Sequence, residues 1–309
     1  MLVPIAVLRR AHHKIGAFAL AIQFSPVISS RRSASGSTFS VQAVDLSALG
    51  EWSSPVLVLD HFRVTGRPFP PHPHAGFSAV TYVFEDSQCG VRSRDSLGND
   101  VVTGPGGIVW TEAGSGLLHE ETPAEPGAEL HAVQIFVNLS AKNKLVAPRM
   151  LKLGSSAVPE WRSIAGDRVR VLAGAYDQIE SPLIPAEPFD LFDIRLQGEV
   201  LFQLPEEHNA IIYVLSGRIC VRTEGHEEEL GAEQAVALVR SGPMSFHAIS
   251  PAHALLLRAA DLREPVRSYG PFIMSEQWQI EAAATRYRSG GMGHLEPISK
   301  VEDASSHTS

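Results

Sequence analysis

The chain is poor in cysteine and in charged residues. Its 309 residues include only two cysteines, Cys89 and Cys220, which excludes a disulfide-built scaffold and predicts reduced thiols in a cytoplasmic protein. Charged residues make up 19% of the chain, the formal net charge is −8, and no cluster of lysine and arginine stands out. We therefore expect no direct binding to nucleic acid.

Long hydrophobic runs are also missing, so we expect no membrane span. The mildly apolar residues 15–28 are interrupted by Gln23, Ser25 and Pro26, and the run is too short to cross a bilayer. The first 44 residues carry basic side chains but no aspartate or glutamate. We predict that residues 1–44 are an N-terminal extension: a segment for organelle targeting or export, a disordered segment, or the product of a start placed too far upstream.

Turn-forming residues, by contrast, are abundant. Glycine occurs 25 times and proline 21 times, which favours short strands over long helices. Runs rich in β-branched and aromatic residues recur between these turns. They lie at 55–60, 77–84, 108–110, 130–138, 168–174, 209–217, 218–222, 235–239 and 254–258, with a tight Ser-Gly turn expected at 216–217. This spacing predicts an all-β protein made of sandwiches or barrels.

The strand runs fall into two series, joined by the less regular residues 139–162. We predict a first β-domain over residues 45–150 and a second over residues 151–298. Helical spacing appears at 275–288, where Trp278, Ala282 and Tyr287 share a face before two glycines. The polar residues 299–309 are expected to form a disordered tail.

The segment around residue 72 carries the first half of a candidate metal site. His72 and His74 are two residues apart beside a proline-rich turn, so on a strand both imidazoles project from the same face. Pro73 stiffens this pair. Two imidazoles on one face make half of a typical divalent metal site.

A second pair follows a glycine-rich turn. His119 and Glu121 are again two residues apart and present a nitrogen and an oxygen to one side. Three imidazoles and one carboxylate suit Fe, Mn, Ni or Cu and leave coordination positions open. Glu120 should face away and serve at the surface, and Glu112 is the alternative carboxylate ligand.

Together these segments resemble the pirin family of the cupin superfamily. The resemblance spans residues 45 to 295. The motifs that carry it are Pro71-His-Pro-His-Ala-Gly-Phe, Thr81-Tyr-Val-Phe-Glu, Arg94-Asp-Ser-Leu-Gly-Asn, Ala113-Gly-Ser-Gly-Leu-Leu-His-Glu-Glu, Val137-Asn-Leu-Ser-Ala-Lys-Asn-Lys, Gly270-Pro-Phe-Ile-Met and Arg286-Tyr-Arg-Ser-Gly.

The resemblance implies a bicupin: two cupin-type, jelly-roll β-barrels with a short C-terminal helix. It also implies one metal in the first barrel, held by His72, His74, His119 and Glu121. Iron is the metal most expected, with Mn, Ni, Cu and Zn as alternatives. The second barrel has no His-x-His pair, and we expect it to be metal-free and structural.

Three positions near the predicted ligands depart from the family pattern. Many pirins have Arg after the His-x-His pair and Glu after Gly-Phe, where this chain has Ala75 and Ser78. Ser93 stands where a histidine often precedes the Asp-Ser turn. Such changes beside a metal site alter the choice of metal, its redox potential or the substrate contacts.

The resemblance leaves competing functions. One is an iron-dependent dioxygenase similar to the quercetinases among pirins, acting on flavonol-type or related aromatic substrates, with Glu121 as ligand and catalytic proton acceptor. The other is a non-enzymatic protein whose metal redox state controls binding to a regulatory protein partner. A third hypothesis is a scaffold protein whose metal only stabilises the fold. We expect a monomer in each case.

Overall fold

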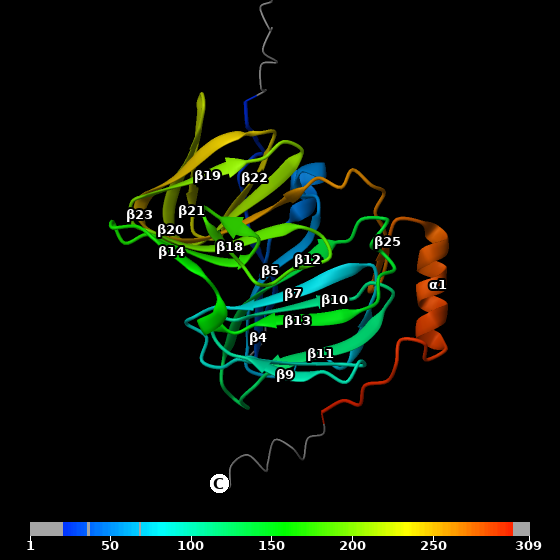
Figure 1. Ribbon diagram of the computed structural model, residues 1–309. Coiled ribbons are helices and arrows are strands. Elements are labelled where there is room, and N and C mark those ends of the chain that lie inside the picture. The colour runs from blue at the N-terminus through cyan, green and yellow to red at the C-terminus, as the bar shows by residue number, and fades with distance from the viewer. Residues whose placement is uncertain (1–20, 36–37, 68, 299–309) are drawn as a thin grey trace, which may run out of the picture.

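The computed structural model describes residues 21–35, 38–67 and 69–298, and these form two β-barrels placed side by side (Figure 1). The expected tail, 299–309, and residues 1–20 lie outside the described residues. The prediction of an all-β bicupin with a short C-terminal helix is confirmed. The boundary between residues 150 and 151 stays a prediction.

The first barrel is built from two antiparallel sheets. Its elements are β3 (Arg31–Ser35), β4 (Phe39–Ala43), η1 (Leu46–Ser53), β5 (Val56–Val64), β6 (His72–His74), β7 (Phe77–Val83), β8 (Val91–Asp95), β9 (Asp100–Thr103), β10 (Ile108–Glu112), β11 (Leu117–Pro123), β12 (Leu130–Asn138) and β13 (Arg149–Leu153). A seven-stranded sheet has the order β13-β10-β7-β12-β5-β4-β3, and a four-stranded sheet has the order β6-β11-β8-β9.

The second barrel is built around two long, bent strands. Its elements are β1 (Gln23–Phe24), β2 (Ile28–Ser29), η2 (Ser155–Ala157), β14 (Glu160–Arg162), β15 (Arg168–Ala173), β16 (Ala175–Tyr176), β17 (Ile179–Glu180), β18 (Phe189–Leu196), β19 (Glu199–Leu204), β20 (His208–Thr223), β21 (His226–Gly231), β22 (Gln234–Val239) and β23 (Gly242–Ala260). The main sheet has the order β1-β22-β20-β23-β18-β15-β14, with β19 on β23, β2 on β22 and β21 on β20, and β16 pairs with β17.

Two sequence predictions need correction here. Strands at residues 23–24, 28–29 and 39–43, which fall within the expected N-terminal extension, pair with both barrels: β1 and β2 with β22, and β4 with β5. The tight turn expected at Ser216-Gly217 is instead a bend inside β20, where the pairing with β23 shifts register and Gly217 has φ of +77°. The left-handed glycine bends the strand without ending it.

The seven-stranded sheet is covered on both faces, which explains why every residue of β7 is buried. One face looks into the first barrel. The other packs against the second barrel, where Leu59, Tyr82 and Phe84 join Tyr213 and Leu257 in one hydrophobic core. Buried apolar area of this kind fixes the two barrels against each other.

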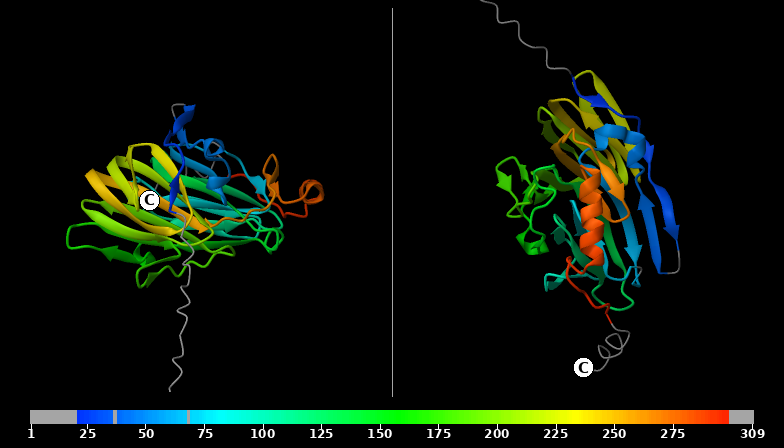
Figure 2. Two further views of the ribbon diagram at one scale, coloured as in Figure 1. Left: turned by 90° about the horizontal axis from the view of Figure 1, so that it is seen from above. Right: turned by 90° about the vertical axis from the view of Figure 1, so that its right-hand side faces the viewer.

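The end of the chain returns to the first barrel. β24 (Arg267–Tyr269) pairs with β25 (Phe272–Met274), and α1 (Gln277–Arg288) follows beside the first barrel (Figures 1 and 2). Ile280 and Ala283 of α1 are buried, whereas Trp278 and Tyr287 of the expected shared face are exposed. Glu276 begins the helix with a capping box. No helix in the described residues is long and apolar enough to cross a membrane.

Candidate metal centre

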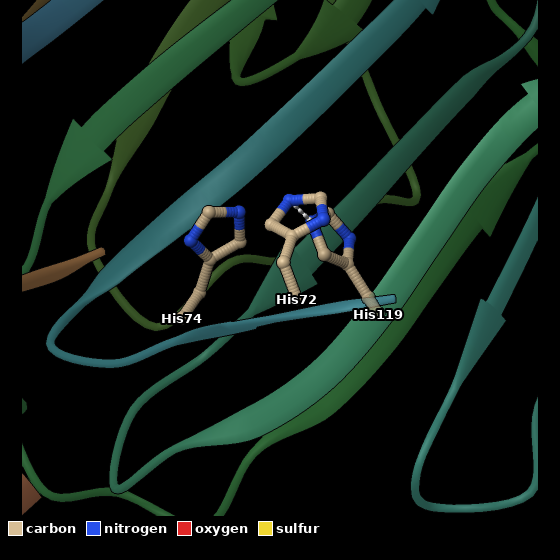
Figure 3. Close-up of side chains that lie close together, drawn as sticks. All are labelled: His72, His74 and His119. Carbon is tan, nitrogen blue, oxygen red and sulfur yellow. Dashed lines mark hydrogen bonds between the residues drawn. The ribbon is translucent and has the colours of Figure 1, made fainter. Parts of the chain in front are cut away.

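The register between β6 and β11 gathers three of the predicted ligands. His119 lies opposite His72, and Leu117 lies opposite His74, so the period-two alternation of strands turns all three imidazoles to one face. Their ring centroids are 4.8 Å (His72–His74), 4.6 Å (His72–His119) and 4.5 Å (His74–His119) apart (Figure 3). Candidate ligand atoms of the three side chains lie within 4.8 Å of one another.

The three side chains have the chemistry that a transition metal requires. Burial, followed by the nearby His72, lowers the pKa of His74 to about 3, and burial likewise lowers the pKa of His119 well below its usual value. Both rings are therefore neutral at pH 7, and each has a buried Nδ1 without a hydrogen-bond partner. His119 Nε2 and His72 Nε2 are 3.1 Å apart. Neutral, clustered imidazoles fit a divalent metal.

Glu121 lines the same cavity but stands apart from the histidine cluster. Its Oε2 accepts a hydrogen bond from Thr81 Oγ1 at 2.5 Å, and its Oε1 accepts one from Ser93 Oγ at 2.9 Å. Burial raises the pKa of Glu121, and the two hydroxyl donors act against that rise. Three of the four predicted ligands are thus gathered, and the role of Glu121 as the fourth stays a prediction.

The neighbouring carboxylates are occupied elsewhere. Glu120 does face away from the histidines, but the expected surface role is wrong, because its side chain is buried against Arg94 with an Nη1–Oε2 distance of 3.0 Å. Glu112, the alternative ligand, accepts hydrogen bonds from Arg149 Nε at 2.5 Å and from Arg149 Nη2 at 3.2 Å. It is not part of the histidine cluster.

The three departures from the family pattern occupy different places. Ser93 contacts the predicted ligand Glu121 directly. Ala75 is fully buried against Phe272 and the C-terminal segment, where a larger cationic side chain would have no room. Ser78 is buried in β7. Of the three, Ser93 is therefore the one that acts on the candidate centre.

A cavity of about 470 Å³ opens beside the histidines, a volume that suits a small organic ligand. Its polar lining outside the predicted ligands is Asp60 and Gln134. Sequence inspection missed these two residues and Thr81. The only sequence feature that points to Asp60 is that it is charged although the neighbouring strand residues are apolar. The only one that points to Gln134 is the alternation of side chains along β12.

In the second barrel, His247 and His253 each pair with a carboxylate. His253 Nε2 donates to Asp193 Oδ1 at 2.8 Å, and His247 Nε2 lies 2.9 Å from Glu199 Oε1. Among the described residues, no group of three or more potential ligands gathers outside the His72, His74 and His119 cluster.

Comparisons with known proteins agree with this architecture. Residues 31–137 match the family Pirin, and residues 191–293 match the Pirin C-terminal cupin domain. A Pseudomonas aeruginosa protein provisionally named a quercetin 2,3-dioxygenase is 34% identical over 250 residues, covering 76% of this chain and 86% of that protein. Pirin of Homo sapiens is 30% identical over 247 residues, covering 77% and 83%.

A solved structure extends the match to three dimensions. The crystal structure of a quercetin 2,3-dioxygenase from Acinetobacter baumannii matches with a TM-score of 0.79 and 26% identity, covering 90% of this chain and 100% of that one. The domain matches, the relatives and the two barrels together show that the chain belongs to the pirin family of cupin proteins.

Proposed function

We propose that this protein is an iron-dependent dioxygenase that acts on flavonols of the quercetin type or on related aromatics. The observation that carries the proposal is the joining of a three-histidine cluster to an apolar cavity of about 470 Å³. Relatives named quercetin 2,3-dioxygenases support the substrate class. His72, His74, His119 and Glu121 would hold the metal.

A divalent transition metal in this cluster supplies open coordination positions for the oxygens of a substrate. The chain's own residues bind the substrate, exclude water and accept its proton. Phenylalanine and valine side chains such as Phe62, Phe136 and Val58 line the cavity and exclude water from a flat aromatic ligand. We assign the Glu121 carboxylate as the acceptor of the substrate's hydroxyl proton, because it lines the cavity and is held there by Thr81 on Oε2 and by Ser93 on Oε1.

The test is flavonol oxidation under air by the iron-loaded protein, compared with an equal amount of free iron. We expect turnover by the wild type, and at least a hundredfold loss with Glu121→Ala, which removes an acid–base group worth roughly 10²–10⁴ in rate. Glu125→Gln, an exposed carboxylate outside the cavity, is the matched control and should keep full activity. Turnover no faster than with free iron would refute the dioxygenase proposal.

Metal content is a separate measurement. We expect about one iron per chain in the purified protein by elemental analysis, and a loss of that iron in His72→Ala and His119→Ala, because each removes one imidazole of the cluster. Another metal at full occupancy would contradict the choice of iron and leave the site itself standing.

A further inference from the structure

The cavity beside the histidines has two walls, and the wall that does not carry the histidines is almost entirely apolar. That wall is the inner face of the seven-stranded sheet, whereas the histidines belong to the small sheet. Apolar side chains dominate the lining: Phe39, Val41, Val58, Phe62, Val64, Phe69, Val91, Leu130 and Phe136. The exceptions on the far wall are the polar residues Asp60 and Gln134.

These two polar residues belong to a row that crosses three strands. In the antiparallel register, Asp60 of β5 lies opposite Gln134 of β12, and Gln134 lies opposite Thr81 of β7. Gln134 Nε2 donates to Thr81 Oγ1 and to the Val80 carbonyl, each at 3.2 Å. The amide of Gln134 is therefore directed along the row toward Thr81, away from Asp60.

The carboxyl group of Asp60 has no hydrogen-bond donor and no ion-pair partner among the residues that the structure describes. Burial raises the pKa of Asp60, and no neighbouring charge acts against that rise. A half-buried carboxyl group in an apolar wall costs free energy unless something in the cavity hydrogen-bonds to it.

We propose that Asp60 is a second anchor for the ligand, accepting a hydrogen bond from a phenolic hydroxyl on the ring that lies away from the histidines. The cavity then selects aromatics that carry hydroxyls at both ends, one end toward the histidine cluster and the other toward Asp60. The naming of flavonols rests on the proposed function. The anchor itself rests on the position of Asp60.

This anchor has a direct consequence for specificity. Quercetin carries hydroxyls on both of its outer rings, whereas 3-hydroxyflavone has the same skeleton and lacks them. The two compounds share the flavonol skeleton, so the change in their affinity ratio when Asp60 is replaced isolates the hydrogen bond to Asp60. A site built to accept that bond binds the ligand lacking the hydroxyl more weakly, because Asp60 is then left unpaired.

The experiment measures the binding of quercetin and of 3-hydroxyflavone to metal-free protein by titration calorimetry. Metal-free protein keeps the measurement independent of turnover. The variants are Asp60→Leu, which removes the acceptor, Asp60→Asn, which keeps the shape and a carbonyl acceptor, and Glu125→Gln as the control. Circular dichroism establishes that each variant is folded.

We expect the wild type and Glu125→Gln to bind quercetin at least roughly tenfold more tightly than 3-hydroxyflavone. Asp60→Leu should reduce this ratio to within about twofold while still binding 3-hydroxyflavone, and Asp60→Asn should fall between them. Equal binding of the two flavonols by the wild type would overturn the proposal, and so would an unchanged ratio in the folded Asp60→Leu or Asp60→Asn variant. If the wild type shows the expected ratio of quercetin to 3-hydroxyflavone affinity but no turnover, the dioxygenase proposal fails and the Asp60 anchor stands.

Discussion

At the scale of single residues, the candidate centre depends on hydroxyl groups as well as on imidazoles. Both oxygens of Glu121 accept hydrogen bonds, one from Thr81 and one from Ser93. These donors fix the carboxylate against the cavity wall. Hydrogen-bond partners of metal ligands orient the ligand and tune its basicity. The serine that departs from the family pattern thus acts on this chain's predicted fourth ligand.

Replacing Thr81 with valine should weaken metal binding. The change keeps the shape of the side chain but frees Glu121 Oε2, so we expect the dissociation constant for the metal to rise by roughly 10–100-fold. Competition with a coloured chelator measures it. Thr111→Val is the matched control, because the Thr111 hydroxyl is buried without a partner. Equal metal affinities in the two variants would show that Thr81 does not position Glu121.

At the scale of elements, the C-terminal segment stabilises the strand that carries His72 and His74. The backbone N–H of Ile273 donates to the Ala75 carbonyl at 3.0 Å. The Lys144 ammonium group is buried and donates to the carbonyls of Gly76, at 2.7 Å, and Ile273, at 3.1 Å, which ties the turn after His74 to β25. Burial lowers the pKa of Lys144 to about 8. The last element of the chain therefore supports the first half of the metal centre.

Gly76 is where this contact is closest. Its φ is +84°, and a Cβ there would lie 1.9 Å from the Ile273 carbonyl oxygen. Gly98 has a similar φ of +92° with open space around it. We expect Gly76→Ala to lower the free energy of unfolding by about 2 kcal/mol more than Gly98→Ala, since both suffer the left-handed strain but only the first displaces β25. Urea denaturation measures the difference, and equal losses would contradict the tight contact.

At the scale of the whole molecule, the two barrels share buried polar groups as well as a hydrophobic core. His61 Nε2 lies 2.7 Å from His131 Nε2, and His61 Nδ1 lies 3.2 Å from the Tyr213 hydroxyl of the second barrel. His131 Nδ1 lies 2.8 Å from Asp86. Tyr82 of the first barrel donates to Asp193 of the second. The contacts of His61 with Tyr213 and of Tyr82 with Asp193 cross between the barrels and, being directional, fix their relative orientation.

The interface should make the fold sensitive to acid. Burial, together with the neighbouring His131 and Arg63, lowers the pKa of His61 to about 3, whereas the unfolded chain binds a proton near pH 6.5. Between these values the unfolded state holds more protons, so stability rises with pH and falls on acidification. At pH 5 the loss attributable to His61 is about 2 kcal/mol.

The variant His61→Gln should show this directly. Its free energy of unfolding, measured by urea denaturation from pH 7 to pH 4, should decline less steeply than that of the wild type, since glutamine does not titrate. His294→Gln, at a largely exposed position, should decline as the wild type does. If the free energy of unfolding of His61→Gln falls with pH as steeply as that of the wild type, then His61 does not stay neutral in the fold.

The sequence by itself determined the elements and the local pairing of ligands. Alternation along a strand puts His72 with His74, and His119 with Glu121, on shared faces whatever surrounds them. Turn residues and β-branched runs likewise indicated an all-β protein, and the helix expected at 275–288 was found at Gln277–Arg288. Such features depend on neighbours in the chain, which a sequence shows directly.

Tertiary structure alone decided what surrounds those ligands. Thr81 and Ser93 reach Glu121, and Asp60 enters the cavity, through pairings between strands distant in the chain. The pairing of residues 23–29 with β22, and the packing of Phe272 against Ala75, were equally out of reach. Alternation along a strand determines which side chains share a face, but only the order and register of the strands determine which residues pack against that face.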